Sequence, residues 1–229
     1  AKFVLGAIAA ALSESDEIGY IADYPIYGTP TSINAFALGA QMVNPRAQIV
    51  LEWSTLPGHS PEAALAARGV HIISSRDISA PHLESRAFGL YHEQDGVIAN
   101  LAMPIWNWGK LYEGIVRSIL TGAWSDEGEH NADRAMNYYM GMSTDAIDII
   151  CSQRLPARTR RLVDLLHERI RAGAFLPFVG PIVDQAGQVH VAADVALTPQ
   201  EIILMDYLAG NVIGRIPSVD ELNDVAKGL

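Results

Sequence analysis

The fold class follows from residues 18–53, IGYIADYPIYGTPTSINAFALGAQMVNPRAQIVLEW. The apolar run at 18–23 predicts a buried strand, and a loop rich in Pro and Gly follows it. Apolar residues then recur at helical spacing over 31–43, and an Asn-Pro pair ends that helix. The run at 48–53 predicts a second strand. A strand, a helix and a strand at this spacing favour a βαβ unit with parallel strands.

The same alternation continues along the rest of the chain. Further strands are predicted at 70–74, 88–92, 97–106 and 146–152. Helices are predicted at 3–12, 61–68, 80–86, 109–121, 157–172 and 199–210, the last with a capping box in TPQE at 198–201. The segment 178–191 predicts a hairpin that turns at Ala186-Gly187. We therefore expect an α/β fold with a mostly parallel, Rossmann-like sheet in which 18–23, 48–53, 70–74 and 88–92 are neighbours.

Composition narrows the function classes. The chain has 229 residues, of which 49% are hydrophobic, so a large core is available. Its net charge of −10 disfavours binding to a phosphate backbone, and we expect no nucleic-acid partner. No run of about 18 uncharged apolar residues is present, which excludes a membrane span in this sequence. The one cysteine, Cys151, excludes an intrachain disulfide.

The motifs of common enzymes are missing from the sequence. It holds no phosphate loop ending in Lys-Ser/Thr, no G-x-G-x-x-G after a strand and no H-E-x-x-H. We therefore expect no catalytic residues, no metal site and no cofactor. A basic cluster, Arg154, Arg158, Arg160 and Arg161, opens the helix at 157–172. A solvated helix face explains it, and phosphate recognition is the alternative, because arginines in a first turn oppose the helix dipole.

Aromatic and polar residues follow several of the predicted strands. Tyr24 and Tyr27 come after the first strand, Trp53 ends the second, Asp77 follows the third, and Trp106, Asn107 and Trp108 follow the strand at 97–106. Carboxyl ends of parallel strands meet at one edge, where α/β folds bind ligands. These seven residues are therefore the candidate ligand-binding set for a flat, polar, ring-bearing molecule. For each residue taken singly, core packing is the alternative.

Five segments, in order, resemble the basic membrane protein family of ABC transporter substrate-binding proteins, which includes purine nucleoside receptors. They are IGYIADYPIYGTPTSINAFALGAQMVNPRA at 18–47, DISAP at 77–81, IANLAMPIWNWGKLYEGIVRSILTGAW at 98–124, FLPFVGPIVDQAGQV at 175–189 and LTPQEIILMDYLAGNVIGRIP at 197–217. The Trp106-Asn107-Trp108 form departs from the nucleoside-binding branch, whose members tend to carry a lysine near this strand. The nucleoside class is thus one candidate for the ligand.

The resemblance implies a periplasmic-binding-protein type I fold with two Rossmann-like lobes and a ligand in the cleft between them. It implies that 17–124 forms one lobe, that 125–229 completes that lobe and returns toward the other, and that the first lobe and a lipid-anchor cysteine would precede Ala1. The implied partner is an ABC transporter permease, and the implied location is extracytoplasmic and membrane-anchored. The alternative is a cytoplasmic, ligand-sensing regulatory module attached to an upstream domain.

The first residues carry a further expectation. The chain opens without methionine inside the apolar run AKFVLGAIAAALSES, which we interpret as an interior helix of a longer protein. A processed N-terminus is the alternative. If a lobe is missing, the helices at 3–12 and 199–210 would lose their cover, and exposed apolar patches of that kind drive association. We therefore expect this chain to form a homodimer with two-fold symmetry.

Overall fold

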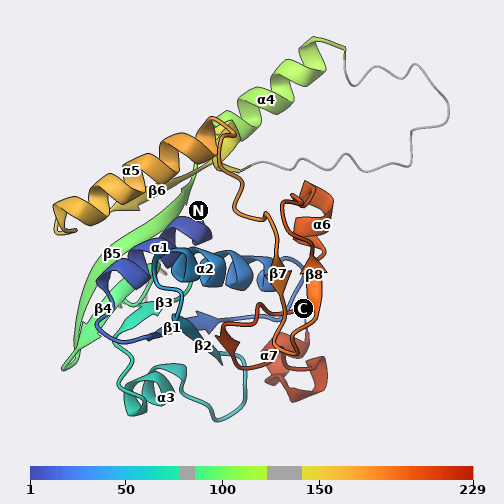
Figure 1. Ribbon diagram of the computed structural model, residues 1–229. Helices are drawn as coiled ribbons and strands as arrows, with labels where there is room; N and C mark the ends of the chain where they lie inside the picture. Colours follow the sequence, from blue (N-terminus) through green and yellow to red (C-terminus); the bar gives the residue numbers. More distant parts are fainter. Residues whose placement is uncertain (78–85, 123–140, 229) are drawn as a thin grey trace.

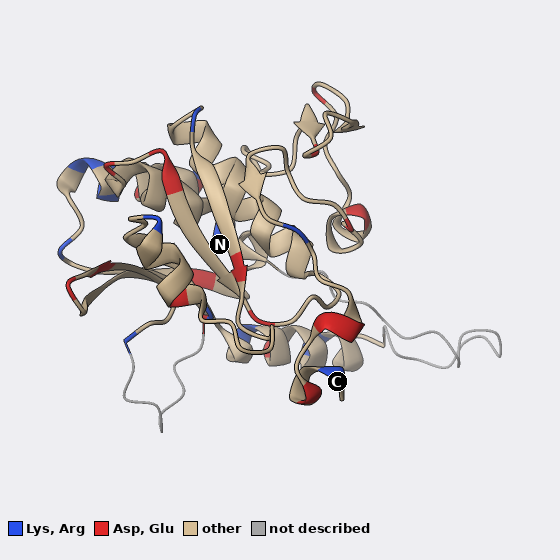
Figure 2. Ribbon diagram, turned by 90° about the horizontal axis from the view of Figure 1, so that it is seen from below, with Lys and Arg blue, Asp and Glu red and all other residues tan. Residues whose placement is uncertain are grey.

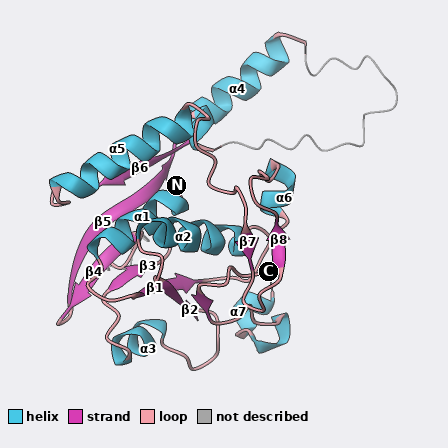
Figure 3. Cartoon of the chain, viewed as in Figure 1, coloured by secondary structure: helices cyan, strands magenta, loops and turns pink. Residues whose placement is uncertain are grey.

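A seven-stranded sheet forms the centre of the protein (Figures 1 and 3). The computed structural model describes residues 1–77, 86–122 and 141–228. The strand order is β6-β5-β4-β3-β1-β2-β9. The strands are β1 (Glu17–Ala22), β2 (Gln48–Trp53), β3 (Ile72–Ser74), β4 (Leu90–Gln94), β5 (Val97–Trp106), β6 (Ile147–Cys151) and β9 (Val212–Ile213). The predicted α/β class is confirmed.

The segment that predicted the fold forms the parallel part of the sheet. β1 pairs with β2 in parallel from Glu17↔Gln48 to Ala22↔Trp53, and β1 also pairs in parallel with β3. Helix α2 (Thr29–Val43) crosses between β1 and β2. Because both faces of these strands are covered, their residues are almost all buried. This burial explains why they appear in the sequence as continuous apolar runs.

The other half of the sheet is antiparallel. The four strands predicted to be neighbours are neighbours, but β4 runs antiparallel to β3, and β5 and β6 continue in this way. For β4 and β5 the cause is a two-residue turn, Asp95-Gly96, where both residues have positive φ, 51° and 77°. Such a turn can only join antiparallel strands. The Asp-Gly pair in the sequence therefore indicates that β4 and β5 are antiparallel to each other, but it does not fix the direction of β4 relative to β3.

Helix α1 (Lys2–Leu12) and α2 pack together on one face of the sheet, and α3 (Pro61–Ala67) covers part of the other (Figure 1). α1 is buried from Phe3 to Ala9. The two helices cross closely, because Gly6 of α1 lies against the backbone of Phe36 and Gly39 of α2 lies against the backbone of Phe3. The expectation that the opening helix would be bare is therefore wrong: α2 and α5 (Ala157–Arg171) cover it.

The segment from Tyr207 to Arg215, here called the closing segment, returns to the sheet. Buried amide side chains bond it to α2. The Asn34 side chain donates to the carbonyl of Tyr207 at 2.8 Å and accepts from the backbone N–H of Ala209 at 2.8 Å. Asn211 donates to the carbonyls of Ala37 and Ala47. These bonds set β9 beside β2 as a seventh strand. A two-residue strand has no periodicity to detect, so the sequence did not predict it.

The predicted hairpin and the predicted helices at 199–210 and 80–86 can now be compared with the structure. The hairpin forms from β7 (Ile182–Val183) and β8 (Val189–Val191). The capping box of α6 (Pro199–Ile203) is confirmed, with Thr198 and Glu201 bonded reciprocally, but this helix is five residues long rather than extending to 210. The predicted helix at 80–86 falls largely outside the described residues. Among the helices that are described, none is long and apolar enough to cross a membrane.

Helix α4 (Trp108–Leu120) is an exposed element. It projects away from the sheet beyond α5 (Figure 1), and none of its residues is buried. Its exposed apolar residues are Trp108, Tyr112, Val116, Ile119 and Leu120. Basic and acidic residues are interspersed over the described chain (Figure 2). Among the described residues, α4 thus carries several exposed apolar side chains, whereas α1 is buried from Phe3 to Ala9.

Candidate functional site

A cavity of about 370 Å³ opens at the carboxyl ends of β1 and β3. This is the edge at which parallel α/β sheets bind ligands. The loop after β1, the first turns of α2, the residues after β3 and the start of α1 form its walls. The lining residues are Lys2, Tyr20, Ile21, Ala22, Asp23, Tyr27, Gly28, Thr29, Ser32, Ser75, Arg76, Asp77 and Ile203.

An ion pair between Lys2 and Asp77 lies at the base of this cavity. Lys2 Nζ is 2.6 Å from Asp77 Oδ1, and the two side chains are only 12% and 16% exposed. Nζ also lies 5.3 Å from the centre of the Tyr20 ring, within range of a cation–π contact. Burial lowers the pKa of the Lys2 ammonium, and the negative charge of Asp77 opposes that shift. Burial likewise raises the pKa of the Tyr20 phenol. The pair therefore fixes a carboxylate at the strand edge.

The loop after β1 is held in place by a second polar group. Asp23 accepts a hydrogen bond from the Ser54 hydroxyl, and its carboxylate lies 3.4 Å from Arg76. The backbone carbonyl of Asp23 accepts from the Thr55 hydroxyl. These contacts join the ends of β1, β2 and β3. They leave Tyr27, which is 67% exposed, at the mouth of the cavity.

Of the seven candidate residues, Tyr27 and Asp77 line this cavity. The other five lie elsewhere. Tyr24 is half-buried, and its carbonyl accepts a hydrogen bond from the Thr29 hydroxyl. Trp53 is buried, and its indole N–H donates to the carbonyl of Arg215 at 2.8 Å. Through that hydrogen bond, Trp53 holds the closing segment against the end of β2.

The Trp-Asn-Trp sequence lies at the junction of β5 and α4. Trp106 pairs with Ile147 of β6, and the Asn107 side chain donates to the carbonyl of Asp145 at 2.9 Å. Both tryptophan side chains are exposed. None of the three residues lines the Asp77 cavity. Their role in ligand binding stays a prediction.

Sequence reasoning missed Lys2, Tyr20 and Arg76 as site residues. A signal for Lys2 was present, because it is the only charged residue in the apolar run AKFVLGAIAAAL. A charged residue on a buried helix requires a partner, and here the partner is 75 residues away in the sequence. No local pattern identifies which acidic residue that partner is.

Comparison with known proteins agrees with this fold. Residues 1–65 match the Bmp family, described as ABC transporter substrate-binding protein, PnrA-like. Over these residues the chain is similar to the Bmp substrate-binding proteins. The resemblance seen in the sequence is thereby confirmed. The matched range covers α1 to the start of α3, including Lys2, Tyr20 and Tyr27, whereas Asp77 lies beyond it.

Two curated relatives of this Bmp-like chain are similar over longer stretches. A purine-binding protein of Brucella abortus is 26% identical over 94% of the chain, which spans 63% of that protein's length. A putative ABC transporter glucose-binding protein of Haloferax volcanii is 30% identical over 54% of the chain and 35% of its own length. The chain thus spans less than two thirds of either relative, and their names refer to different ligands.

A solved structure supports the fold. The crystal structure of a transcriptional activator of the comK gene from Bacillus halodurans superposes with a TM-score of 0.54 at 13% identity. The match covers 77% of this chain and 63% of that one. At this identity the likeness concerns the arrangement of helices and strands alone.

Proposed function

We propose that this Bmp-like chain is part of the substrate-binding component of an ABC transporter. It would bind a small molecule, with the nucleoside class as the first candidate, in a cleft between two lobes. The observation that carries the proposal is the largely buried carboxylate of Asp77, held by Lys2 at the carboxyl edge of the parallel strands. The similarity of residues 1–65 to the Bmp family supports it.

The chemistry of the cavity fits a polar, ring-bearing ligand. A carboxylate oxygen accepts hydrogen bonds from hydroxyl or N–H groups, and sugars and purine bases both present such donors. Tyr27 at the mouth supplies an exposed aromatic ring on which a flat ring can stack. In this proposal Asp77 fixes the orientation of the ligand and Tyr27 covers it. Binding alone, without conversion of the ligand, is the proposed activity.

Transport requires further parts of the system. The proposed partner is a membrane permease, and the proposed location is outside the cytoplasm, at the membrane surface. The regulatory alternative places the same ligand-binding module in the cytoplasm, attached to another domain. Ligand uptake separates the two: cells lacking a transport receptor lose uptake of the ligand, whereas cells lacking a regulator keep the uptake system but lose its control.

Binding is tested by calorimetry on the protein at its full natural length, titrated with purine nucleosides, free purines and glucose. Tyr27→Ala should weaken binding of a ring-bearing ligand by about 1–3 kcal/mol. Tyr112→Ala is the matched control, because Tyr112 on α4 is similarly exposed, at 61%, and does not line the cavity. Asp77→Asn should weaken binding as well.

The proposal fails under either of two results. One is the absence of binding to every molecule of the panel. The other is binding that Tyr27→Ala and Asp77→Asn leave unchanged while both variants remain folded by circular dichroism. Equal losses in Tyr27→Ala and Tyr112→Ala would move the site away from this cavity.

A further inference from the structure

Tyr20 brings a hydroxyl group to the floor of the Asp77 cavity. It lies on β1 beside Ser74 of β3, and only 5% of the residue is exposed. Two neighbours hold its ring. Phe36 packs edge-on against it, with ring centres 5.2 Å apart, and the Lys2 ammonium lies 5.3 Å from its centre. Because the close-packed core fixes the ring, it also fixes the direction of the hydroxyl.

The Tyr20 hydroxyl has no hydrogen-bond partner within the part of the chain that the structure describes. The polar side-chain atoms there that are both sealed from solvent and unpartnered are Tyr91 Oη and Asn211 Oδ1. Tyr20 Oη is not among them, so it opens into the cavity that Tyr20 lines. Burial, and then the carboxylates of Asp77 and Asp23, raise the pKa of the phenol. The group therefore stays protonated and keeps a proton to donate.

The neighbouring charged groups leave an acceptor free. The Lys2 ammonium has three N–H donors, and protein oxygens accept all of them: Asp77 Oδ1 at 2.6 Å, the Ser75 carbonyl at 3.4 Å and the Ser74 hydroxyl at 3.4 Å. Asp77 Oδ2 receives no hydrogen bond from the described residues. The floor of the cavity therefore offers a ligand a free donor, Tyr20 Oη, and a free acceptor, Asp77 Oδ2.

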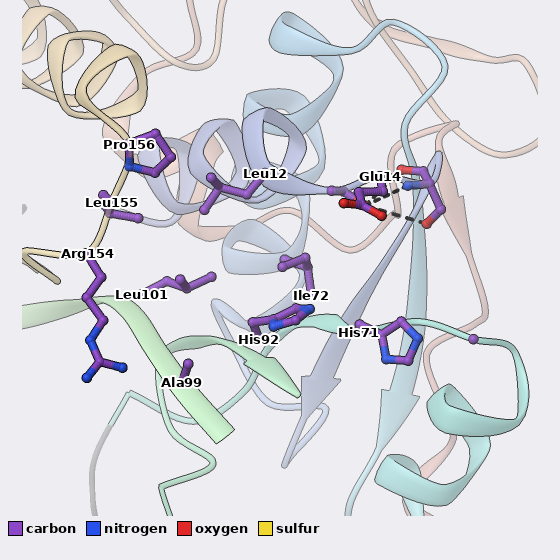
Figure 4. A pocket seen from close by; sticks show the side chains of 13 residues that line it. Leu12, Glu14, His71, Ile72, His92, Ala99, Leu101, Arg154, Leu155 and Pro156 are labelled. Atoms are coloured by element: carbon purple, nitrogen blue, oxygen red, sulfur yellow. Dashed lines mark hydrogen bonds between the residues drawn. The ribbon is translucent and has the colours of Figure 1, made fainter. Parts of the chain in front are cut away.

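A larger cavity, of about 510 Å³, lies at the opposite edge of the sheet and lacks this feature. It opens between the end of α1 and the start of α5 (Figure 4). The polar side chains that line it, including Glu14, His71 and Arg154, are exposed or half-buried. Groups in such positions remain hydrated without a ligand. The buried hydroxyl without a protein partner lies at the smaller cavity.

We propose that Tyr20 is a specificity-determining residue of the Asp77 cavity and that its hydroxyl bonds a sugar hydroxyl of a bound nucleoside. This inference rests on the proposed function. A hydroxyl group accepts a hydrogen bond from Tyr20 and donates one to Asp77 at the same time, which a carbonyl oxygen or an exocyclic amino group cannot do. The flat purine ring stacks on Tyr27 at the mouth, so the sugar is the part that reaches the floor.

Calorimetry on the protein at its full natural length tests this contact. The probes are adenosine and its 2′-, 3′- and 5′-deoxy analogues, each of which lacks one sugar hydroxyl, and weak analogues are measured by competition against adenosine. Tyr20→Phe removes the phenol oxygen and keeps the ring. Tyr91→Phe is the matched control, because Tyr91 is also a buried strand tyrosine with an unpartnered hydroxyl and does not line the cavity. Arg154→Gln is a second control, placed in the larger cavity.

We expect Tyr20→Phe to weaken adenosine binding by about 3- to 10-fold, the usual worth of a neutral hydrogen bond. One of the three deoxy analogues should bind the natural protein and Tyr20→Phe equally, because it lacks the hydroxyl that Tyr20 bonds. A purely structural role of Tyr20 would instead weaken all four probes alike. Tyr91→Phe and Arg154→Gln should leave all four affinities unchanged.

The inference is overturned if Tyr20→Phe binds adenosine as tightly as the natural protein does, if it weakens adenosine and every analogue by the same factor, or if Tyr91→Phe has an equal effect. Adenosine binding that depends on Tyr27 and Asp77 but not on the Tyr20 hydroxyl would refute this inference alone. Binding of glucose without binding of adenosine would do the same. Absence of binding to every nucleoside, purine and sugar of the panel would refute the proposed function itself.

Discussion

The crossing of α1 and α2 depends on two glycines, and Gly6→Ala tests it directly. A Cβ atom added at Gly6 would lie 2.0 Å from the carbonyl oxygen of Phe36, whereas ordinary contact begins at 3.4 Å. The obstacle is backbone, so no side-chain rotation relieves it. The helices would have to separate by more than about 1 Å, and close-packed interiors resist such shifts. This separation would loosen the most deeply buried helix pair of the fold.

Two opposing contributions set how far Gly6→Ala changes the free energy of unfolding. Overpacking a core costs about 1–3 kcal/mol, and a backbone clash belongs at the upper end of that range. Replacing glycine within a helix recovers up to about 1 kcal/mol. We therefore expect Gly6→Ala to lower the free energy of unfolding by about 2 kcal/mol. Gly109→Ala in α4 is the control, because nothing lies within 4 Å of its added Cβ, and it should be neutral or slightly stabilising.

Gly39→Ala provides a second test of the same helix crossing. Its added Cβ would lie 1.9 Å from the carbonyl oxygen of Phe3, across the same crossing. One separation of the helices relieves both clashes, so Gly6→Ala and Gly39→Ala together should cost little more than either alone. Urea unfolding followed by tryptophan fluorescence measures all four variants. The reasoning is refuted if Gly6→Ala unfolds within 0.5 kcal/mol of the natural protein, which is about the scatter expected at neutral sites, or if the two costs add in full.

Three further predictions concern polar contacts. The Arg215 guanidinium lowers the pKa of the Glu221 carboxyl to about 2 from 4.5. That pairing stabilises the fold above pH 4.5 and is lost as pH falls from 4.5 toward 2, so Glu221→Gln should flatten the acid side of a stability–pH curve within this window. Lys2→Met should destabilise the protein by about 3 kcal/mol by leaving the Asp77 charge unpaired, and adding Asp77→Asn should restore part of the melting temperature. Asn34→Ala should cost about 3 kcal/mol in guanidinium unfolding, because two buried backbone groups of the closing segment lose their partner; a cost below 1 kcal/mol would contradict this.

The elements that the sequence predicted share one property: their signals are local. Apolar runs marked β1 and β2, helical spacing marked α2 and α5, and a capping box marked the start of α6. Each depends on residues within one or two turns of each other, where backbone geometry leaves few alternatives. The resemblance to the Bmp family rests on the same local segments. Fold class and the resemblance to the Bmp family could therefore be recognised before any three-dimensional arrangement was known.

Only the tertiary structure decided which residues meet. The Lys2–Asp77 pair joins residues 75 apart, and Asn34 holds a segment more than 170 residues away. Trp53 is a second example. Its place at the end of a strand predicted a ligand contact, and in the structure its indole N–H donates to the carbonyl of Arg215 in the closing segment. A residue's place at the end of a strand fixes only the position of its backbone. The carbonyl and charged groups of distant segments that pack against it decide whether its side chain is buried, hydrogen-bonded or open to a ligand.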